Sequence, residues 1–418
     1  MNIFISLIKN ITKTKVFANF VNLSTIQVSN ILLMMLMIPV ITRAVGLEMF
    51  GQVMVANAFA ALVSILVTYA TTQTSVKDIA VAAKNSGILS KIFTETLFIR
   101  IIFFTLVIIG MLLAKPIFSG DYLLYVTAIP LIFAEVVNPL FFYLGQEDLK
   151  LFNLSNLLTK IVIIFVILIF IDSKSDAVWV NFIIGGANSI SYLLMLLLIC
   201  KKYQLSIIRP KIKDCKLIIK DNFYLVANNF SVYLQQSIML FALQIGGSDT
   251  LLGAYSICDK IVWSCRILII SIFNAIYPKA SKLFSESSLK WQHFKKNVKL
   301  GTAVLFFVGS LILFIFPDLI IYVLTGKTND EASLFLREMA FVPFIAALNF
   351  MNVLDRLLHN DNYTIFKIAL IILLLSAILS SLFIFFKEFE FVGFYILIIE
   401  TFSLLLYEFF IRRSKSYA

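Results

Sequence analysis

Charged side chains occur inside stretches of this chain that are otherwise apolar, and these side chains are the ones that could do chemistry. The cations are Arg100, Lys160, Lys260, Arg266 and Arg337, and the acids are Glu135, Asp259, Glu338 and Glu400. If the stretches cross a membrane, each charge near their middle costs about 2.5–3.5 kcal/mol on insertion scales. Cations kept at that cost predict a water-filled cavity that binds an anion.

The position of each cation along its stretch distinguishes two interpretations. Arg100 and Arg337 lie where a long side chain can reach the membrane surface, so snorkelling explains them equally well. Lys160 lies deeper, and Arg266 lies past the middle of its stretch, where snorkelling explains it least. We interpret all five cations, Lys260 included, as a candidate substrate-binding set.

The acids also allow two interpretations. Asp259 and Arg266 are seven residues apart, which places them on one helix face about two turns from each other. Lys260 is turned by about 100° from Asp259 and need not pair with it. Glu135 and Glu400 are isolated in apolar stretches. They are candidate carriers of a coupling proton, or they neutralise the cations, which the sequence favours slightly.

Amide side chains form a stripe on two further stretches. They recur at helical spacing as Asn222, Asn229 and Gln236 on one, and as Asn19, Asn22 and Asn30 on the other. Such stripes make hydrogen bonds between membrane helices or line a hydrophilic cavity. Both stripes fall on the first helix of a repeated half, which favours the cavity. We therefore expect Asn30, Asn229, Gln236 and Asp259 to line its wall.

The elements that must position these residues are membrane helices. Hydrophobic residues make up 60% of the 418 residues and charged residues 14%, with a mean hydropathy of +0.95. Soluble domains are about 45–50% apolar and about 25% charged. Apolar runs of about 20 residues predict helices and exclude a barrel, whose strands alternate and have about 10 residues. We predict an all-α polytopic membrane protein.

Twelve spans are predicted. They cover residues 18–41, 51–75, 93–114, 122–145, 152–171, 178–200, 222–246, 251–275, 300–324, 332–354, 364–386 and 391–411. Residues 1–15 place apolar side chains on one face and lysines on another, which predicts a short interfacial helix.

Basic residues concentrate in alternate loops and predict the orientation of the chain. The loops on one side include 201–221 and 276–299, which carry seven and six Lys or Arg residues. The loops on the other side carry one each: Arg43, Lys115, Lys174, Lys327 and Lys387. Because basic loops stay in the cytoplasm, both termini are predicted to be cytoplasmic. The net charge of +11 therefore orients the chain, and no nucleic-acid partner is predicted.

Two segments about 200 residues apart resemble each other. Each runs from Asn-Phe (Asn19 and Asn222) through an apolar helix to a Gly-bounded turn, and the copies end at Gly51 and Gly253. Repeated halves in a membrane chain are typical of transporters. We predict lobes at 1–200 (helices 1–6) and 222–418 (helices 7–12), joined by a cytoplasmic linker at 201–221. Both halves start and end inside, so the pseudo-twofold axis runs along the membrane normal.

The sequence has no motif for catalysis or cofactor binding. There is no P-loop and no GxSxG, the four cysteines have no CxxC spacing, and His293 and His359 lie in different loops. The predicted outer loops are about ten residues or shorter, which disfavours a glycan polymerase. We expect no enzyme activity, no cofactor and no metal. We expect the energy for transport to come from gradients or from reactions on either side of the membrane.

Four segments resemble, in the same order, segments of the polysaccharide flippases of the Wzx type within the multidrug/oligosaccharidyl-lipid/polysaccharide exporter superfamily. The segments contain the motifs Pro39-Val40-Ile41-Thr42-Arg43-Ala44-Val45-Gly46, Thr74-Ser75-Val76-Lys77-Asp78, Asn138-Pro139-Leu140-Phe141 and Gly253-Ala254-Tyr255-Ser256. The resemblance covers residues 17 to 290, and the last four spans match mainly in hydropathy. It departs at Tyr69-Ala70-Thr71, where the family often has Asp-Phe-Gly, so no role of that acid is carried over.

The resemblance implies a fold, a substrate and a location. It implies two six-helix lobes around a V-shaped cationic cavity that opens alternately to each side of the bacterial inner membrane. The implied substrate is an O-antigen repeat unit linked to undecaprenyl pyrophosphate, and the implied partners are membrane lipids and the polymerase and chain-length regulator of the same pathway. Alternatives are a cation-coupled drug antiporter of the same superfamily and a lipid II-type flippase.

Overall fold

The computed structural model describes residues 15–82, 85–117, 122–359 and 361–415, without the side chains of 15–34, 117, 275, 278, 362 and 413–415. The predicted interfacial helix at 1–15 and the side chain of Asn30 therefore lie outside the described residues. The described residues form helices and contain no strand. Contacts group them into two compact units: Met1–Ser29 with Val53–Phe230, and Asn30–Gln52 with Ser231–Ala418. We call these unit 1 and unit 2.

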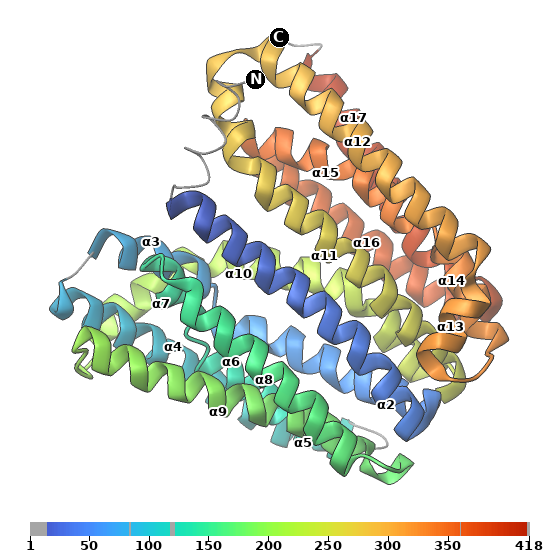
Figure 1. The fold of residues 1–418 in the computed structure, drawn as a ribbon, viewed down its shortest axis with the longest axis horizontal. Helices are drawn as coiled ribbons and strands as arrows, with labels where there is room; N and C mark the ends of the chain where they lie inside the picture. Colours follow the sequence, from blue (N-terminus) through green and yellow to red (C-terminus); the bar gives the residue numbers. More distant parts are fainter. Residues whose placement is uncertain (1–14, 83–84, 118–121, 360, 416–418) are drawn as a thin grey trace, which may run out of the picture. The chain divides into compact units, whose positions relative to one another are not determined.

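Unit 1 contains both long and short helices (Figure 1). Its helices are the first and last parts of α2 (Lys15–Thr68), α3 (Thr71–Ala82), α4 (Ser86–Leu113), α5 (Tyr122–Thr127), α6 (Ile129–Val136), α7 (Leu140–Gly145), α8 (Leu149–Phe170), α9 (Ala177–Tyr203) and the first part of α10 (Ile212–Gly246). Helices α8 and α9 run side by side, and α9 also packs against α5 and α6. Between α3 and α7, Gly145 leaves no room for a side chain, because a methyl group there would lie 2.7 Å from Cβ of Ile79.

Unit 2 contains the remaining helices. They are the middle of α2, the end of α10, α11 (Asp249–Glu286), α12 (Ser288–Ile315), α13 (Pro317–Thr325), α14 (Asp330–Met339), α15 (Val342–Leu358), α16 (Asn362–Phe386) and α17 (Phe394–Lys415). Helix α15 is central, because it packs against α11, α12, α16 and α17. Short 3-10 turns at Lys115–Ile117, Lys174–Asp176 and Phe389–Phe391 complete the described secondary structure.

Each predicted span is helical where it is described, but several are broken. The predicted span 122–145 is three helices, with the second break at Asn138-Pro139. The predicted span 300–324 breaks at Pro317, which cannot donate a backbone hydrogen bond. Helix α10 begins at Ile212, ten residues before the predicted span, because Cys215, Ile218 and Ile219 pack into an apolar cluster of unit 1.

Fewer than twelve of the described helices pass a test of length and apolar composition for crossing a membrane. Among the described residues, nine helices or helical runs are long and apolar enough to cross a membrane, or ten if the bent α11 counts as one. The number is lower than twelve partly because Met35–Ala82 counts as one helical run, whereas the sequence predicted two spans there, 18–41 and 51–75. Twelve crossings, two six-helix lobes and the 201–221 linker remain predictions. Residues Gln204–Lys211 are non-helical and include the helix-stopping Arg209-Pro210.

The Gly-bounded turn predicted after the first span is a backbone break within α2. Gly46 has φ 80° and ψ 164°, a conformation that favours glycine. The corresponding turn in the second copy separates α10 from α11, and the Ser248 hydroxyl caps α11 by accepting a hydrogen bond from Leu251 N. The terminal glycines of the two copies meet inside unit 2: a methyl group on Gly51 would lie 2.7 Å from the backbone nitrogen of Gly253.

We expect Gly51→Ala to lower the free energy of unfolding of the purified protein by about 1–3 kcal/mol, and with it the unfolding temperature, because an added methyl group has no space between two backbones. The matched control is Gly301→Ala on α12, where no atom beyond the adjoining backbone of α12 lies within 4 Å of the added methyl group. That change should be neutral or stabilising by up to about 1 kcal/mol. Equal unfolding temperatures for the two variants would contradict the close contact.

Candidate functional site

Helix α11 carries the polar side chains of a small cavity in unit 2. Asp259, Trp263 and Arg266 share one face of α11 at helical spacing. The cavity is lined by Gln235, Gln236, Asp259, Val262, Trp263, Arg266, Tyr395, Ile396 and Ile399. It offers about 20 Å³ to the centre of a water molecule, which is enough for about one water. The predicted residues Gln236, Asp259 and Arg266 therefore lie together at a site that has room for about one water molecule and none for a sugar.

Arg266 forms an ion pair with Glu400 of α17 beside this cavity. The two side chains are only 15% and 13% exposed, and the Nε of Arg266 is buried without a hydrogen-bond partner among the described residues. Bulk water therefore screens this pair weakly. One isolated acid predicted from the sequence is thus the partner of the deepest predicted cation. A coupling proton on Glu400 stays a prediction.

The charges of this cluster nearly balance. Arg266 and Lys260 both interact electrostatically with Asp259, and Glu400 neutralises Arg266. A ligand anion that approaches Arg266 must therefore compete with a carboxylate that is already bound. Lys260 is half-buried and its side chain forms no ion pair among the described residues.

Arg100 lies in unit 1 and is fully buried. Its guanidinium donates to the hydroxyls of Thr71 and Thr72, each at 2.9 Å. It also donates to the carbonyl oxygens of Glu135, Val136 and Asn138, at 3.2, 3.4 and 2.9 Å. The ring of Phe141 lies 4.8 Å from the guanidinium carbon. The snorkelling expected as one alternative for Arg100 is not seen, because the charge is buried among protein oxygens.

The break between α6 and α7 explains why a cation is needed there. Helix α6 ends at Val136, and its last carbonyl groups have no partner within the helix. A helix C-terminus also carries a partial negative charge, which a cation stabilises. Arg100 supplies the missing donors and the charge together. This position is structural in unit 1, and its role in substrate binding stays a prediction.

Glu135 lines another cavity, which lies in unit 1. The cavity is about 270 Å³ and is bounded by Asn57, Ala61, Ser64, Ile65 and Thr68 of α2 and by Leu131 and Glu135 of α6. The Glu135 carboxylate accepts a hydrogen bond of 3.1 Å from the Asn138 amide. This cavity combines hydroxyl, amide and carboxylate groups at the predicted membrane depth. A coupling proton on Glu135 stays a prediction.

The other predicted residues lie apart from these clusters. The Lys160 ammonium on α8 is buried and has no hydrogen-bond partner among the described residues. The Asn229 amide donates to Gln73 at 3.2 Å, which fits the helix–helix interpretation of its stripe. Arg337 is exposed and 3.9 Å from Asp318, a weak surface pair. Glu338 is buried beside Gly393, where a methyl group would overlap its carboxylate.

Some polar residues of these sites were not predicted from the sequence. Trp263 follows Asp259 by four residues and precedes Arg266 by three, so helical spacing could have placed it at the cavity. Arg356 is buried at the end of α15 and pairs with Asp361 at 2.7 Å. Arg356 lies two residues beyond the end of a predicted span, so the sequence analysis did not count it among the charged residues inside the membrane. Among the described residues, no group of three His, Cys, Asp or Glu side chains can hold a metal ion.

Comparison with known sequences identifies relatives over most of the chain. Residues 16–284, more than half of the chain, match the family described as polysaccharide biosynthesis protein. A protein of Escherichia coli (strain K12) named "Putative O-antigen transporter" is 24% identical over 374 residues, which cover 88% of this chain and 90% of the relative. A Shigella dysenteriae protein of the same name is 24% identical over 277 residues, covering 63% and 67%.

Comparison with solved structures shows the fold. An inward-facing multidrug resistance MATE family transporter of the MOP superfamily matches with a TM-score of 0.70 at 16% identity, covering 92% of this chain and 98% of that chain. An outward-facing structure of such a transporter matches with a TM-score of 0.63 at 16% identity, covering 97% of each chain. With the apolar helices, these similarities make the chain a multi-pass membrane protein.

We expect Arg100→Lys to destabilise unit 1 by about 2–4 kcal/mol, because one ammonium cannot replace the five contacts and leaves buried carbonyls unsatisfied. The measurement is thermal unfolding of the purified protein. The matched control, Arg412→Lys, changes a side chain that is 85% exposed and should shift the midpoint little. A midpoint of Arg100→Lys equal to that of the control would show that the network contributes nothing to stability.

Proposed function

This chain belongs to the polysaccharide biosynthesis protein family, and on that basis we propose that it flips an oligosaccharide linked to undecaprenyl pyrophosphate from the cytoplasmic to the periplasmic leaflet of the bacterial inner membrane. In this proposal two lobes, 1–200 and 222–418, alternate between openings around a cationic cavity, and the linker 201–221 and both termini are cytoplasmic. The names of the relatives support a transporter rather than an enzyme. The polymerase and chain-length regulator of the same pathway are the proposed partners.

The observation that carries the proposal is a largely buried guanidinium, that of Arg266, whose ion-pair partner is the Glu400 carboxylate. Arg266 lies on the face of α11 that also carries Asp259, with Glu400 as its ion-pair partner and a water-sized cavity beside it. A pyrophosphate and its sugars cannot cross hydrocarbon unaided, whereas a polyprenyl tail can remain in lipid. Arg binds phosphate through paired hydrogen bonds, so Arg266 can hold the head group in place of Glu400.

The membrane potential can drive this direction of transport. With the cytoplasm negative, moving an anion outward gains about 2.3 kcal/mol per charge for each 100 mV. A pyrophosphate diester carries negative charge at neutral pH, so export needs no ATP. This agrees with a chain whose sequence has no nucleotide-binding motif.

A cation-coupled drug antiporter is the second candidate. The observation in its favour is that the α11 cavity and its ion pair hold two carboxylates, Asp259 and Glu400, near one guanidinium. Organic cations need acids more than bases at their binding site. Drug resistance on expression in a sensitive strain, with no effect on surface glycan, would favour this candidate.

We expect Arg266→Gln to abolish surface glycan in cells that depend on this protein, because the head group loses its guanidinium. It should also lower the amount of folded protein, since breaking a buried pair leaves Glu400 unpartnered at a cost of about 3–5 kcal/mol. The double variant Arg266→Gln/Glu400→Gln should restore the protein but not the glycan. Gel analysis of the glycan and immunoblots of membranes measure the two effects.

The control for this pair of variants is Lys282→Gln, a 78% exposed lysine on the same helix. It should leave both glycan and protein unchanged. Normal glycan in the double variant would make the ion pair purely structural and remove Arg266 from the substrate site. Failure of the reconstituted protein to expose lipid-linked oligosaccharide on the far side of vesicles would overturn the proposed function itself.

A further inference from the structure

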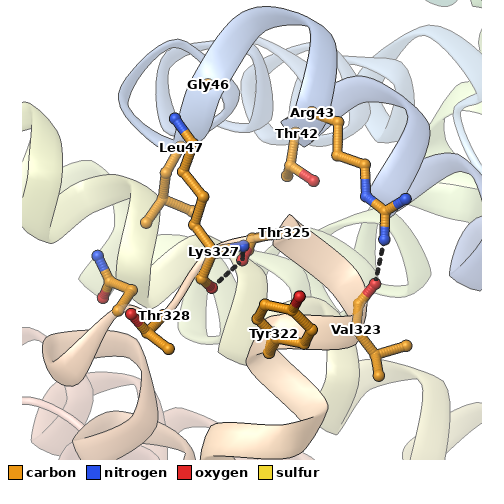
Figure 2. Close-up of a pocket in the computed structure, with 11 residues that line it drawn as sticks. Thr42, Arg43, Gly46, Leu47, Tyr322, Val323, Thr325, Lys327 and Thr328 are labelled. Atoms are coloured by element: carbon orange, nitrogen blue, oxygen red, sulfur yellow. Dashed lines mark hydrogen bonds between the residues drawn. The ribbon is translucent and has the colours of Figure 1, made fainter.

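A large pocket in unit 2 lies away from the α11 cavity. It opens between the backbone break of α2 at Gly46 and the turn that joins α13 to α14, and its volume is about 690 Å³ (Figure 2). Ligand pockets of proteins are commonly about 300–1,000 Å³. Its position falls at the end of the helices that the loop charges predict to face outward, and nothing in the proposed transport step uses it.

The charged residues of this pocket are both cations. Arg43 and Lys327 line it, and no carboxylate is among the lining residues. Figure 2 shows the Lys327 side chain extending along the pocket toward Gly46 and Leu47. Neither cation forms an ion pair with another described residue. Two unneutralised cations facing one cavity make it a site for an anion.

Hydrogen bonds fix the Arg43 guanidinium and the backbone of Lys327. The Arg43 Nη2 donates to the carbonyl of Val323 at 2.8 Å, which leaves most of its five N–H groups available. The Thr325 hydroxyl donates to the Lys327 carbonyl at 2.7 Å and accepts from the Lys327 backbone nitrogen at 3.2 Å. The backbone of Lys327 is therefore pinned while its ammonium stays exposed.

The end of α13 does not oppose an anion here. A helix C-terminus carries about half a negative charge, but donors already cover its last carbonyls. Arg43 donates to the carbonyl of Val323, and the Gly326 nitrogen donates to that of Tyr322 at 2.8 Å. The Thr42 hydroxyl lies 3.0 Å from the carbonyl of Leu324 and shares its proton with the carbonyl of Ile38 at 2.7 Å. Two full positive charges outweigh the remaining partial charge. The hydroxyls of Tyr322 and Thr328 add neutral hydrogen-bonding groups at the wall.

The surface beside the pocket is apolar. Leu319, Tyr322 and Val323 of α13 are each more than half exposed. A ligand with an anionic head and an apolar tail would satisfy both surfaces at once. We propose that this pocket binds the phosphate head group of an anionic lipid, with Arg43 and Lys327 on the phosphate and the lipid tail along α13. This site does not depend on the proposed transport function.

The test is lipid binding to the purified full-length protein by native mass spectrometry. The probes are phosphatidylglycerol, undecaprenyl phosphate and inorganic phosphate, with phosphatidylcholine as the zwitterionic reference. We expect phosphatidylglycerol or undecaprenyl phosphate to bind more tightly than phosphatidylcholine, and the stronger of the two identifies the source of the head group. Binding of inorganic phosphate alone would overturn the lipid assignment, as would equal binding of all lipids.

Variants locate the binding at this pocket. Lys327→Gln should weaken it about fivefold, because an exposed charge contact contributes up to about 1 kcal/mol, and Lys327→Arg should retain it. The matched control is Lys387→Gln, another exposed lysine of a loop predicted to be on the same side. Arg43→Gln combined with Lys327→Gln should weaken binding by tenfold or more. Equal affinities of Lys327→Gln, Lys387→Gln and the unmodified protein would overturn the proposal.

Discussion

The low dielectric of the membrane interior is the constraint on which the rest of this structure depends, because a charge there needs a partner from the protein itself. Arg100 and Arg266 meet this requirement in two different ways. Arg100 is surrounded by neutral oxygens of Thr71, Thr72 and three carbonyls, whereas Arg266 is held by the carboxylate of Glu400. The first arrangement uses many fixed contacts and is rigid. The second depends mainly on one ionic partner, which another anion can replace.

Cations and broken helices occur together in both units. A break leaves carbonyl groups without intrahelical donors, and in a membrane no water replaces them. In unit 1, Arg100 caps the carbonyls freed by the break at Asn138-Pro139. In unit 2, Arg43 and Thr42 cap the end of α13. The cations Arg100 and Arg43 therefore stabilise the C-terminal ends of neighbouring helices, which is a structural role that needs no substrate.

The sequence predicted the helices and the shared face of Asp259 and Arg266, since both follow from local periodicity. It did not predict that Arg100 binds carbonyls or that Arg266 pairs with Glu400, because these partners are far apart along the chain. The breaks at Pro139 and Pro317 were visible as residue types, but a run of apolar residues masks them in a hydropathy window. The sequence marked Gly51 and Gly253 as the ends of the two repeated segments, but it did not predict that the two glycines are in contact.

Under the proposed function, the Arg266–Glu400 pair provides a physical basis for coupling substrate binding to the change of conformation. A phosphorylated head group that binds Arg266 replaces one anion by another, so the guanidinium is never left bare in a low dielectric. The displaced Glu400 must then be hydrated or protonated, and the adjacent cavity has room for about one water. A ligand shifts a conformational equilibrium only through its different affinity for the two states. The exchange of partners at Arg266 supplies such a difference, since the bond between α11 and α17 exists only while the substrate is absent.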